Sequence, residues 1–152
     1  MKNILDACCG SRMFWFDKED ERVLFQDKRE LKEKLCDGRI LEIKPDIIGD
    51  FTKMKFEDNS FNLVVFDPPH LVKVGKKSWM AKKYGNLTDN WREDLRNGFK
   101  ECFRVLKDNG VLIFKWNERD IKVSEILKLI NRKPLFGHRT RHNGQTIWIT
   151  FI

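Results

Sequence analysis

Short apolar runs rich in β-branched residues recur along the chain and predict the strands of a sheet. They stand at residues 3–7, 23–26, 63–66 and 111–116, and several show little alternation of apolar and polar side chains. Uninterrupted apolar strands are typical of a parallel sheet that is buried on both faces. Residues 45–51 are expected to form a further strand and its exit. The pattern predicts an α/β protein.

Two helices are expected between and after these strands. The longer one has Asp89 as its N-cap and runs to about residue 106, before the turn signal Asn109-Gly110. A shorter helix is expected at residues 123–131. The longer helix carries one apolar face, made of Trp91, Leu95, Phe99, Cys102, Phe103 and Leu106. That face is expected to pack on the core, and we assign it no other role.

The connection between the first two strands is too short for a full crossover helix. Only twelve residues separate Gly10 from Val23, and a crossover with its helix needs about a dozen or more. We expect a loop or one or two helical turns here, with Trp15 and Phe16 packed onto the sheet. Stacking of Phe14 or Trp15 on a cofactor is the alternative, but core packing is the simpler interpretation.

Two turn signals predict β-hairpins. Asp37-Gly38 stands between partly alternating segments and predicts a small hairpin insertion within residues 31–43. A helix over residues 28–36, ended by Gly38, is the alternative. Asn143-Gly144 lies between residues 135–139 and 146–152 and predicts a terminal antiparallel pair of strands.

Length and composition describe one soluble domain over residues 1–152. Hydrophobic residues make up 41% of the chain and charged residues 35%, which suits a globular protein with a core of its own. No apolar run reaches membrane-spanning length and no signal peptide is visible, so we expect a cytoplasmic protein. The four cysteines, at 8, 9, 36 and 102, form no Cys-x-x-Cys pair. We therefore expect reduced thiols and no metal site.

The positive charge is concentrated in two segments. The formal net charge is +7, and no acidic residue occurs between Leu71 and Thr88 or after Glu125. Acid-free basic segments suit a polyphosphate partner, although solvated lysine loops would show the same composition. The first segment interleaves its lysines with the aromatic residues Trp79 and Tyr84. Its candidate substrate-binding residues are Lys73, Lys76, Lys77, Trp79, Lys82 and Lys83.

The sequence Asp67-Pro68-Pro69-His70 directly follows the apolar run at residues 63–66. The prolines offer no backbone N–H and fix φ, so the chain leaves the sheet stiffly at its carboxyl edge, where open α/β sheets bind ligands. Asp67 and the carbonyl of Pro68 can both accept hydrogen bonds from a planar amino group, and His70 can stack on its ring. The alternative is an ordinary turn with a capping aspartate.

Asp67-Pro68-Pro69-His70 resembles the Asp-Pro-Pro-aromatic motif of class I S-adenosylmethionine-dependent amino-methyltransferases, which methylate adenine N6 or cytosine N4. The whole chain resembles short bacterial members of that group, often phage- or prophage-encoded, in which a motif like Asp6-Ala-Cys-Cys-Gly-Ser recurs. The resemblance implies a Rossmann-like fold with a seven-stranded, mostly parallel sheet, an antiparallel last strand and some helices trimmed. It implies methyl transfer to a nucleic-acid base, with DNA favoured over RNA and catalysis by Asp67, Pro68, Pro69 and His70.

The same resemblance implies which residues bind S-adenosylmethionine. Those expected around its methionine part are Asp6, Ala7, Cys8 and Gly10. Asp27 would hold the ribose, and it lies seventeen residues beyond Gly10, close to the spacing usual for such an acid. Asp50 would meet the adenine amino group and Phe51 would pack on its ring. Of three glycines in the family's pattern only Gly10 is present, with Cys8 and Arg12 at the other places.

Two other functions fit the sequence. One is a methyltransferase acting on RNA or on a protein amide, although protein glutamine methyltransferases of this kind carry Asn where Asp67 stands. The other is a basic nucleic-acid-binding module without catalysis, which the altered glycine turn would suit. No segment lies outside the catalytic fold to read a base sequence. A homodimer, a recognition partner, or a single-stranded or RNA substrate would therefore be required.

Overall fold

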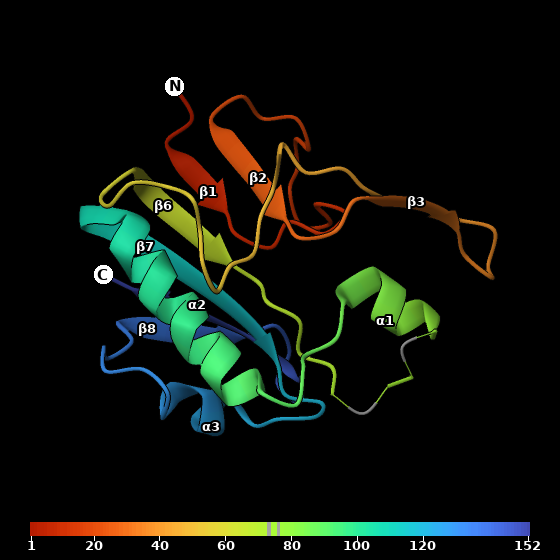
Figure 1. Cartoon of the computed structure of the whole chain (residues 1–152). Coiled ribbons are helices and arrows are strands. Elements are labelled where there is room, and N and C mark those ends of the chain that lie inside the picture. The colour runs from red at the N-terminus through yellow and green to blue at the C-terminus, as the bar shows by residue number, and fades with distance from the viewer. Residues whose placement is uncertain (73, 76) are drawn as a thin grey trace.

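A seven-stranded sheet forms the centre of the computed structural model, which describes residues 1–72, 74–75 and 77–152 (Figure 1). The strand order is β5-β2-β1-β6-β7-β9-β8. The first five strands in this order, β5, β2, β1, β6 and β7, pair in parallel. Strand β9 runs antiparallel to both of its neighbours, β7 and β8. The strands are β1 Ile4–Asp6, β2 Val23–Asp27, β5 Ile47–Ile48, β6 Phe61–Phe66, β7 Leu106–Asn117, β8 Phe136–Arg139 and β9 Thr146–Phe151.

The sheet confirms the fold class expected from the sequence. Leu5 pairs with Val64 and Val64 with Leu112 at the centre of the sheet, and all three side chains are fully buried. These positions face the main core, which explains why the central runs are so apolar. The terminal hairpin of β8 and β9 is also present, as its Asn-Gly turn predicts.

Helix α2, Trp91–Val105, covers the sheet over β6 and β7 (Figure 1). Its buried residues Leu95, Phe99 and Cys102 pack in one cluster with the sheet, and each large apolar side chain buried there contributes about 1.5–3 kcal/mol. Its N-cap is Asn90, one residue after the expected Asp89. Helix α3, Val123–Leu127, is shorter than expected. Within the described residues, no helix has the length and apolar character needed to cross a membrane.

The connections leading to β5 contain a loop and a hairpin. Residues 7–22 form turns, as their length predicts, and β3 Leu31–Lys34 pairs antiparallel with β4 Ile40–Ile43. The hairpin prediction is confirmed, and the alternative helix over residues 28–36 is wrong. Because Leu31, Leu41 and Ile43 pack among themselves, the hairpin has a small core of its own. The fold is therefore trimmed of helices on this side.

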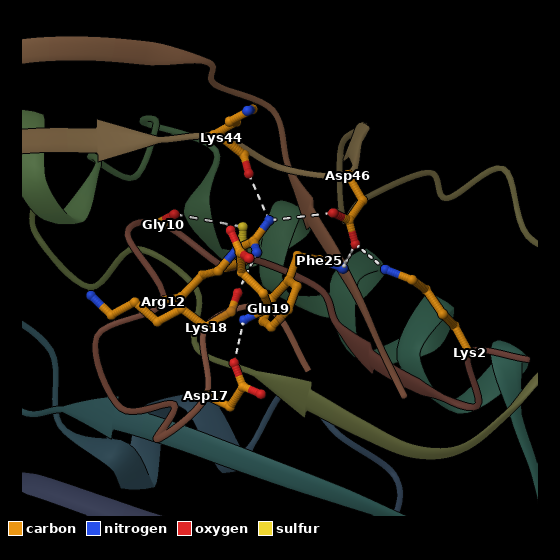
Figure 2. Close-up of polar contacts among 10 residues, drawn as sticks. Lys2, Gly10, Arg12, Asp17, Lys18, Glu19, Phe25, Lys44 and Asp46 are labelled. Carbon is orange, nitrogen blue, oxygen red and sulfur yellow. Dashed lines mark hydrogen bonds and ion pairs between the residues drawn. The ribbon is translucent and has the colours of Figure 1, made fainter. Parts of the chain in front are cut away.

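Side chains of the first loop cover β2 where a helix would otherwise pack. Trp15 meets the ring of Phe25 edge-on, with 5.4 Å between ring centroids, and the Arg12 guanidinium carbon lies 3.8 Å from the centre of the same ring. Arg12 also donates to the carbonyls of Lys18 and Lys44 (Figure 2). Trp15 packs as expected, but Phe16 is fully exposed, and the prediction for it is wrong. Because Arg12 and Trp15 already pack against the ring of Phe25, Phe16 does not pack there.

Three further boundaries differ from the sequence prediction. Residues expected in a loop form helix α1, Trp79–Tyr84, where the Ser78 hydroxyl accepts a hydrogen bond from the Ala81 amide and caps the first turn. Strand β7 starts at Leu106 and includes Asn109-Gly110, with Asn109 at a φ of 61°. Strand β5 has only two residues. At these three positions the local sequence pattern does not determine where the helix or strand begins and ends.

Candidate active site

One open cavity, with about 790 Å³ of empty space counted out to its mouth, lies at the carboxyl ends of β1, β2 and β6. It is lined by the loop after β1, the residues that follow β2 and β5, the Asp-Pro-Pro-His segment, and the end of α1. The lining residues among those expected at the site are Ala7, Cys8, Gly10, Asp27, Phe51, Asp67, Pro68, Pro69, His70 and Lys83. Parallel strands bring these segments together although they are far apart in the chain.

The loop after β1 is held by both neighbouring strands. The Ala7 amide donates to the Val65 carbonyl at 2.9 Å, and the Gln26 side chain donates to the Ala7 carbonyl at 3.2 Å. Gly10 has a φ of +50°, and no atom lies within 4 Å of where a Cβ would stand. Arg12 adopts a φ of 56°, so it keeps a left-handed backbone that a glycine would favour. The loop thus remains a tight turn with one glycine.

Asp6 lies beneath this loop and does not line the cavity as expected for a cofactor-binding residue. Its carboxylate is fully buried and accepts hydrogen bonds from the Trp15 indole at 2.7 Å and the Cys8 amide at 3.3 Å. Burial raises the pKa of Asp6 to about 7, against the hydrogen bond from Trp15. The structure therefore gives Asp6 the role of holding the loop, and its expected contact with the cofactor stays a prediction.

Asp27 lines the cavity at the end of β2, where both of its carboxylate oxygens have partners. The Gly10 amide donates to Oδ2 at 2.9 Å, and the Arg29 amide donates to Oδ1 at 2.9 Å. The Arg29 side chain also reaches Oδ1 at 3.3 Å and donates to the Lys82 carbonyl at 2.8 Å. Arg29 was not predicted as a site residue, because in the sequence it is simply a basic residue next to Lys28.

Phe51 and Asp50 follow β5, and only Phe51 of the two lines the cavity. Phe51 lines the cavity and is held edge-on against Phe66, with 5.2 Å between ring centroids. Asp50 is exposed, and its Oδ1 accepts hydrogen bonds from the amide and hydroxyl of Thr52, each at 2.8 Å. Its Oδ1 is thus used in a local turn, and the expected contact of Asp50 with the cofactor base stays a prediction.

Asp67 pairs with a lysine of the neighbouring strand. Lys115 Nζ donates to Asp67 Oδ2 at 2.8 Å, and both side chains are about one-fifth exposed. Burial raises the pKa of Asp67, and the charge of Lys115 opposes this rise. Lys115 was not expected as a site residue. Its signal in the sequence is that it is the one charged residue of the run 109–117.

His70 presents a neutral ring to the cavity. Burial, together with the nearby charge of Lys115, lowers its pKa to about 4. Its ring lies 5.6 Å from that of Tyr84 and 6.2 Å from that of Trp116, measured between centroids. Tyr84 also lines the cavity and was not expected there. An uncharged ring flanked by aromatic side chains is suited to contact with a planar ligand.

The basic segment contributes one of its predicted lysines to the cavity lining. Lys83 lines the cavity, and its Nζ lies 5.1 Å from the centre of the Tyr84 ring. Lys82 forms an ion pair with Glu33 of the hairpin at 2.7 Å. Lys77 and Trp79 are exposed. Lys73 and Lys76, also expected here, lie outside the described residues.

No family model matches the chain. A curated protein, malonyl-[acyl-carrier protein] O-methyltransferase 1 of Coxiella burnetii, is 28% identical to this chain over 96 residues. The match spans 63% of this chain but only 26% of that relative's length.

Solved structures are similar in fold to nearly the whole chain. The PH0226 protein of Pyrococcus horikoshii has a TM-score of 0.62 at 16% identity, over 97% of this chain and 80% of its own. A TehB-like SAM-dependent methyltransferase of Corynebacterium glutamicum has a TM-score of 0.58 at 12% identity, over 97% and 78%. A SAM-dependent methyltransferase of Leishmania major has a TM-score of 0.54 at 15% identity, over 97% and 63%. The chain therefore has the class I methyltransferase fold, with a seven-stranded sheet whose strand β9 is antiparallel.

Proposed function

We propose that this protein is an S-adenosylmethionine-dependent N-methyltransferase that acts on the exocyclic amino group of a nucleic-acid base. One observation carries the proposal. The Asp67–His70 segment and the turn at Gly10 line the same cavity, at the edge of the sheet where such folds bind their ligands. A methyl donor and an amino group bound there would meet.

The cavity offers suitable groups for the cofactor. Gly10 leaves room for close approach to the backbone, Asp27 supplies carboxylate oxygens for ribose hydroxyls, and Phe51 supplies an aromatic surface for adenine. Ala7 and Cys8 would lie against the methionine part. The bound cofactor would supply an electrophilic methyl group. Because Asp27 now bonds to Arg29, its oxygens would be shared between that side chain and the ribose.

Asp67 and His70 would orient the amino group for attack. Asp67 and the carbonyl of Pro68 would each accept a hydrogen bond from it, which turns the nitrogen lone pair toward the methyl group. The stiff Pro68-Pro69 step would fix both acceptors. His70 would stack on the base, and as a neutral ring it would not repel a protonated amine product. The rate enhancement would come from positioning more than from proton transfer.

The arrangement favours an amine over an oxygen acceptor. The Coxiella relative is an O-methyltransferase by name, and a substrate carboxylate is the natural rival to an amine. However, Asp67 and a backbone carbonyl would repel a carboxylate, whereas both would accept hydrogen bonds from NH2. The net charge of +7 and Lys83 at the cavity support a polyanionic substrate, and we place DNA before RNA.

The test is a transfer assay with radiolabelled S-adenosylmethionine. Single-stranded DNA, duplex DNA, RNA and an acidic small molecule would be offered in parallel to the wild type and to Asp67→Ala. We expect label on one nucleic acid and at least a hundredfold loss in the variant, as is typical when a positioning group is removed. S-adenosylhomocysteine should still raise the melting temperature of both proteins.

Two outcomes would contradict the proposal. Label on the acidic molecule alone would make the protein an O-methyltransferase. Absence of any thermal stabilisation by S-adenosylhomocysteine would favour a binding module without catalysis, because only a ligand that binds the native state stabilises it.

A further inference from the structure

Lys115 and Asp67 form a lateral pair between two parallel strands. Phe66 of β6 pairs with Phe114 of β7, so the residues that follow them, Asp67 and Lys115, lie side by side. Lys115 Nζ meets Oδ2 of Asp67 at 2.8 Å. Lys115 is not among the residues that line the cavity, whereas Asp67 is. The lysine therefore contacts the carboxylate without itself lining the cavity.

Aromatic rings enclose the ammonium group of Lys115. Its Nζ lies 5.3 Å from the centre of the Phe14 ring and 5.6 Å from that of Trp148, the residue paired with it on β9. Phe14 and Trp148 meet edge to face at 5.4 Å between centroids. Rings at these distances attract a cation through their faces and restrict its movement. The ammonium is thus held in place on two sides, with Asp67 on the third.

We propose that Lys115 is a positioning residue, which fixes Asp67 through Oδ2 so that Oδ1 is the oxygen that receives the target amino group. The inference rests on the proposed function. A carboxylate bound at one oxygen by a charged donor cannot rotate freely, so its other oxygen stays aimed into the cavity. The aromatic enclosure explains why the lysine stays near Asp67 instead of extending to solvent.

The ion pair with Lys115 favours the ionised form of Asp67, which the surroundings of Asp67 otherwise disfavour. Asp6 from β1 and Asp27 from β2 are the other carboxyl groups of the same region, and burial disfavours the charged form of Asp67. The thiol of Cys8 and the neutral ring of His70 face the same site without supplying positive charge. Among these groups, Lys115 is the cation in direct contact with Asp67. Without it, the carboxyl group would be protonated more readily and would lose acceptor capacity.

The test compares Lys115→Met, which keeps much of the length of the side chain without its charge, with Lys115→Arg. Lys107→Met is the matched control, because Lys107 is an exposed lysine at the opposite end of the same strand. The substrate is a single-stranded DNA oligonucleotide containing adenine and cytosine. For Lys115→Met we expect kcat to fall by about ten- to a hundredfold. Binding of S-adenosylhomocysteine should change little, and Lys115→Arg should recover much of kcat.

A second readout distinguishes positioning from a structural effect. The titration of Asp67 would be followed directly by 13C NMR of carboxyl-labelled aspartate, with the resonance assigned from Asp67→Asn. Loss of a neighbouring ammonium should move both this titration and the acid limb of the kcat profile to higher pH, by about one unit. Lys115→Arg and Lys107→Met should leave both in place.

Each contrary result has one meaning. An unshifted Asp67 titration in folded Lys115→Met, or an unchanged kcat, would overturn the role of Lys115 alone. A wild type that binds cofactor but methylates no amine would overturn the proposed function and the role of Lys115 with it. If Lys115→Met fails to fold, the same titration in Lys115→Gln decides.

Discussion

The buried carboxyl group of Asp6 should make stability depend on pH. Burial raises its pKa from an ordinary 3.8 to about 7 in the folded protein. Between these values the unfolded chain has lost the proton and the folded protein keeps it, so rising pH favours unfolding. Its contribution should fall by on the order of 1 kcal/mol per pH unit across this window and level off above the folded pKa.

Comparison with Asp6→Asn isolates this effect, because the amide keeps the shape of the side chain but does not titrate. The free energy of unfolding would be measured in urea from about pH 4.5 to 9.5. We expect the wild type to lose stability relative to the variant as pH rises toward 7, and the difference to be constant above about pH 8. Parallel curves for the two proteins would show that Asp6 ionises without penalty in the folded state.

Single residues also show what the sequence can predict about the site. The Asp67–His70 motif and Gly10 identify strand ends, and parallel strands bring such ends together, so their convergence follows from the fold. The direction of a side chain depends on its partners in space. Asp6 accepts a hydrogen bond from Trp15, which no local pattern reveals, whereas Asp50 bonds to Thr52 in a local turn of the kind that aspartate favours.

At the scale of elements, burial decides which predictions succeed. Strands β1, β2, β6 and β7 are recognisable because at least one of their faces packs in the core. Strand β5 consists of two exposed residues at the edge, so the strand expected within residues 45–51 is present but much shorter than that range. Helix α1 escapes prediction because it is six residues long and depends on a Ser78 cap and tertiary contacts. Hairpins are predicted well because their turn residues act locally.

The approach of α2 to the sheet depends on Gly98. A Cβ at this position would lie 2.7 Å from the Phe51 ring and 2.8 Å from the Phe66 ring. We expect Gly98→Ala to lower the free energy of unfolding by about 1–3 kcal/mol through overpacking. It should also weaken S-adenosylhomocysteine binding, because Phe51 lines the cavity. Chemical denaturation and calorimetric titration measure the two effects.

An exposed position of the same helix provides the control. Lys100 is exposed, and Lys100→Ala changes helix propensity only slightly, so it should leave both quantities nearly unchanged. Elsewhere in a helix interior, alanine is more stable than glycine by roughly 0.5–1 kcal/mol. A Gly98→Ala protein that gains stability would therefore show that the helix can move away from the sheet without cost.

Across the whole molecule, the two ends of the parallel strands differ in what they offer a polyanion. The carboxyl edge carries the cavity, Lys83 at its lining and exposed Lys77. At the opposite, amino edge of the parallel strands lies Leu106, the first residue of β7, followed by exposed Lys107. Helix α2 carries exposed Lys100. A nucleic acid that places a base in the cavity would run along the first edge, so lysines of equal charge should contribute unequally.

Replacing Lys77 and Lys83 together by Ala should weaken nucleic-acid binding and reduce its salt dependence, because each phosphate contact adds about 0.9 to the slope of log K against log salt on duplex DNA. We expect the slope to fall by about one to two. The double variant Lys100→Ala and Lys107→Ala removes the same charge from other surfaces and should change the slope by much less. Fluorescence anisotropy with a labelled oligonucleotide, from about 50 to 300 mM salt, compares the two. Equal changes would mean that net charge alone attracts the nucleic acid, and a larger change in the second variant would place the binding surface away from the cavity.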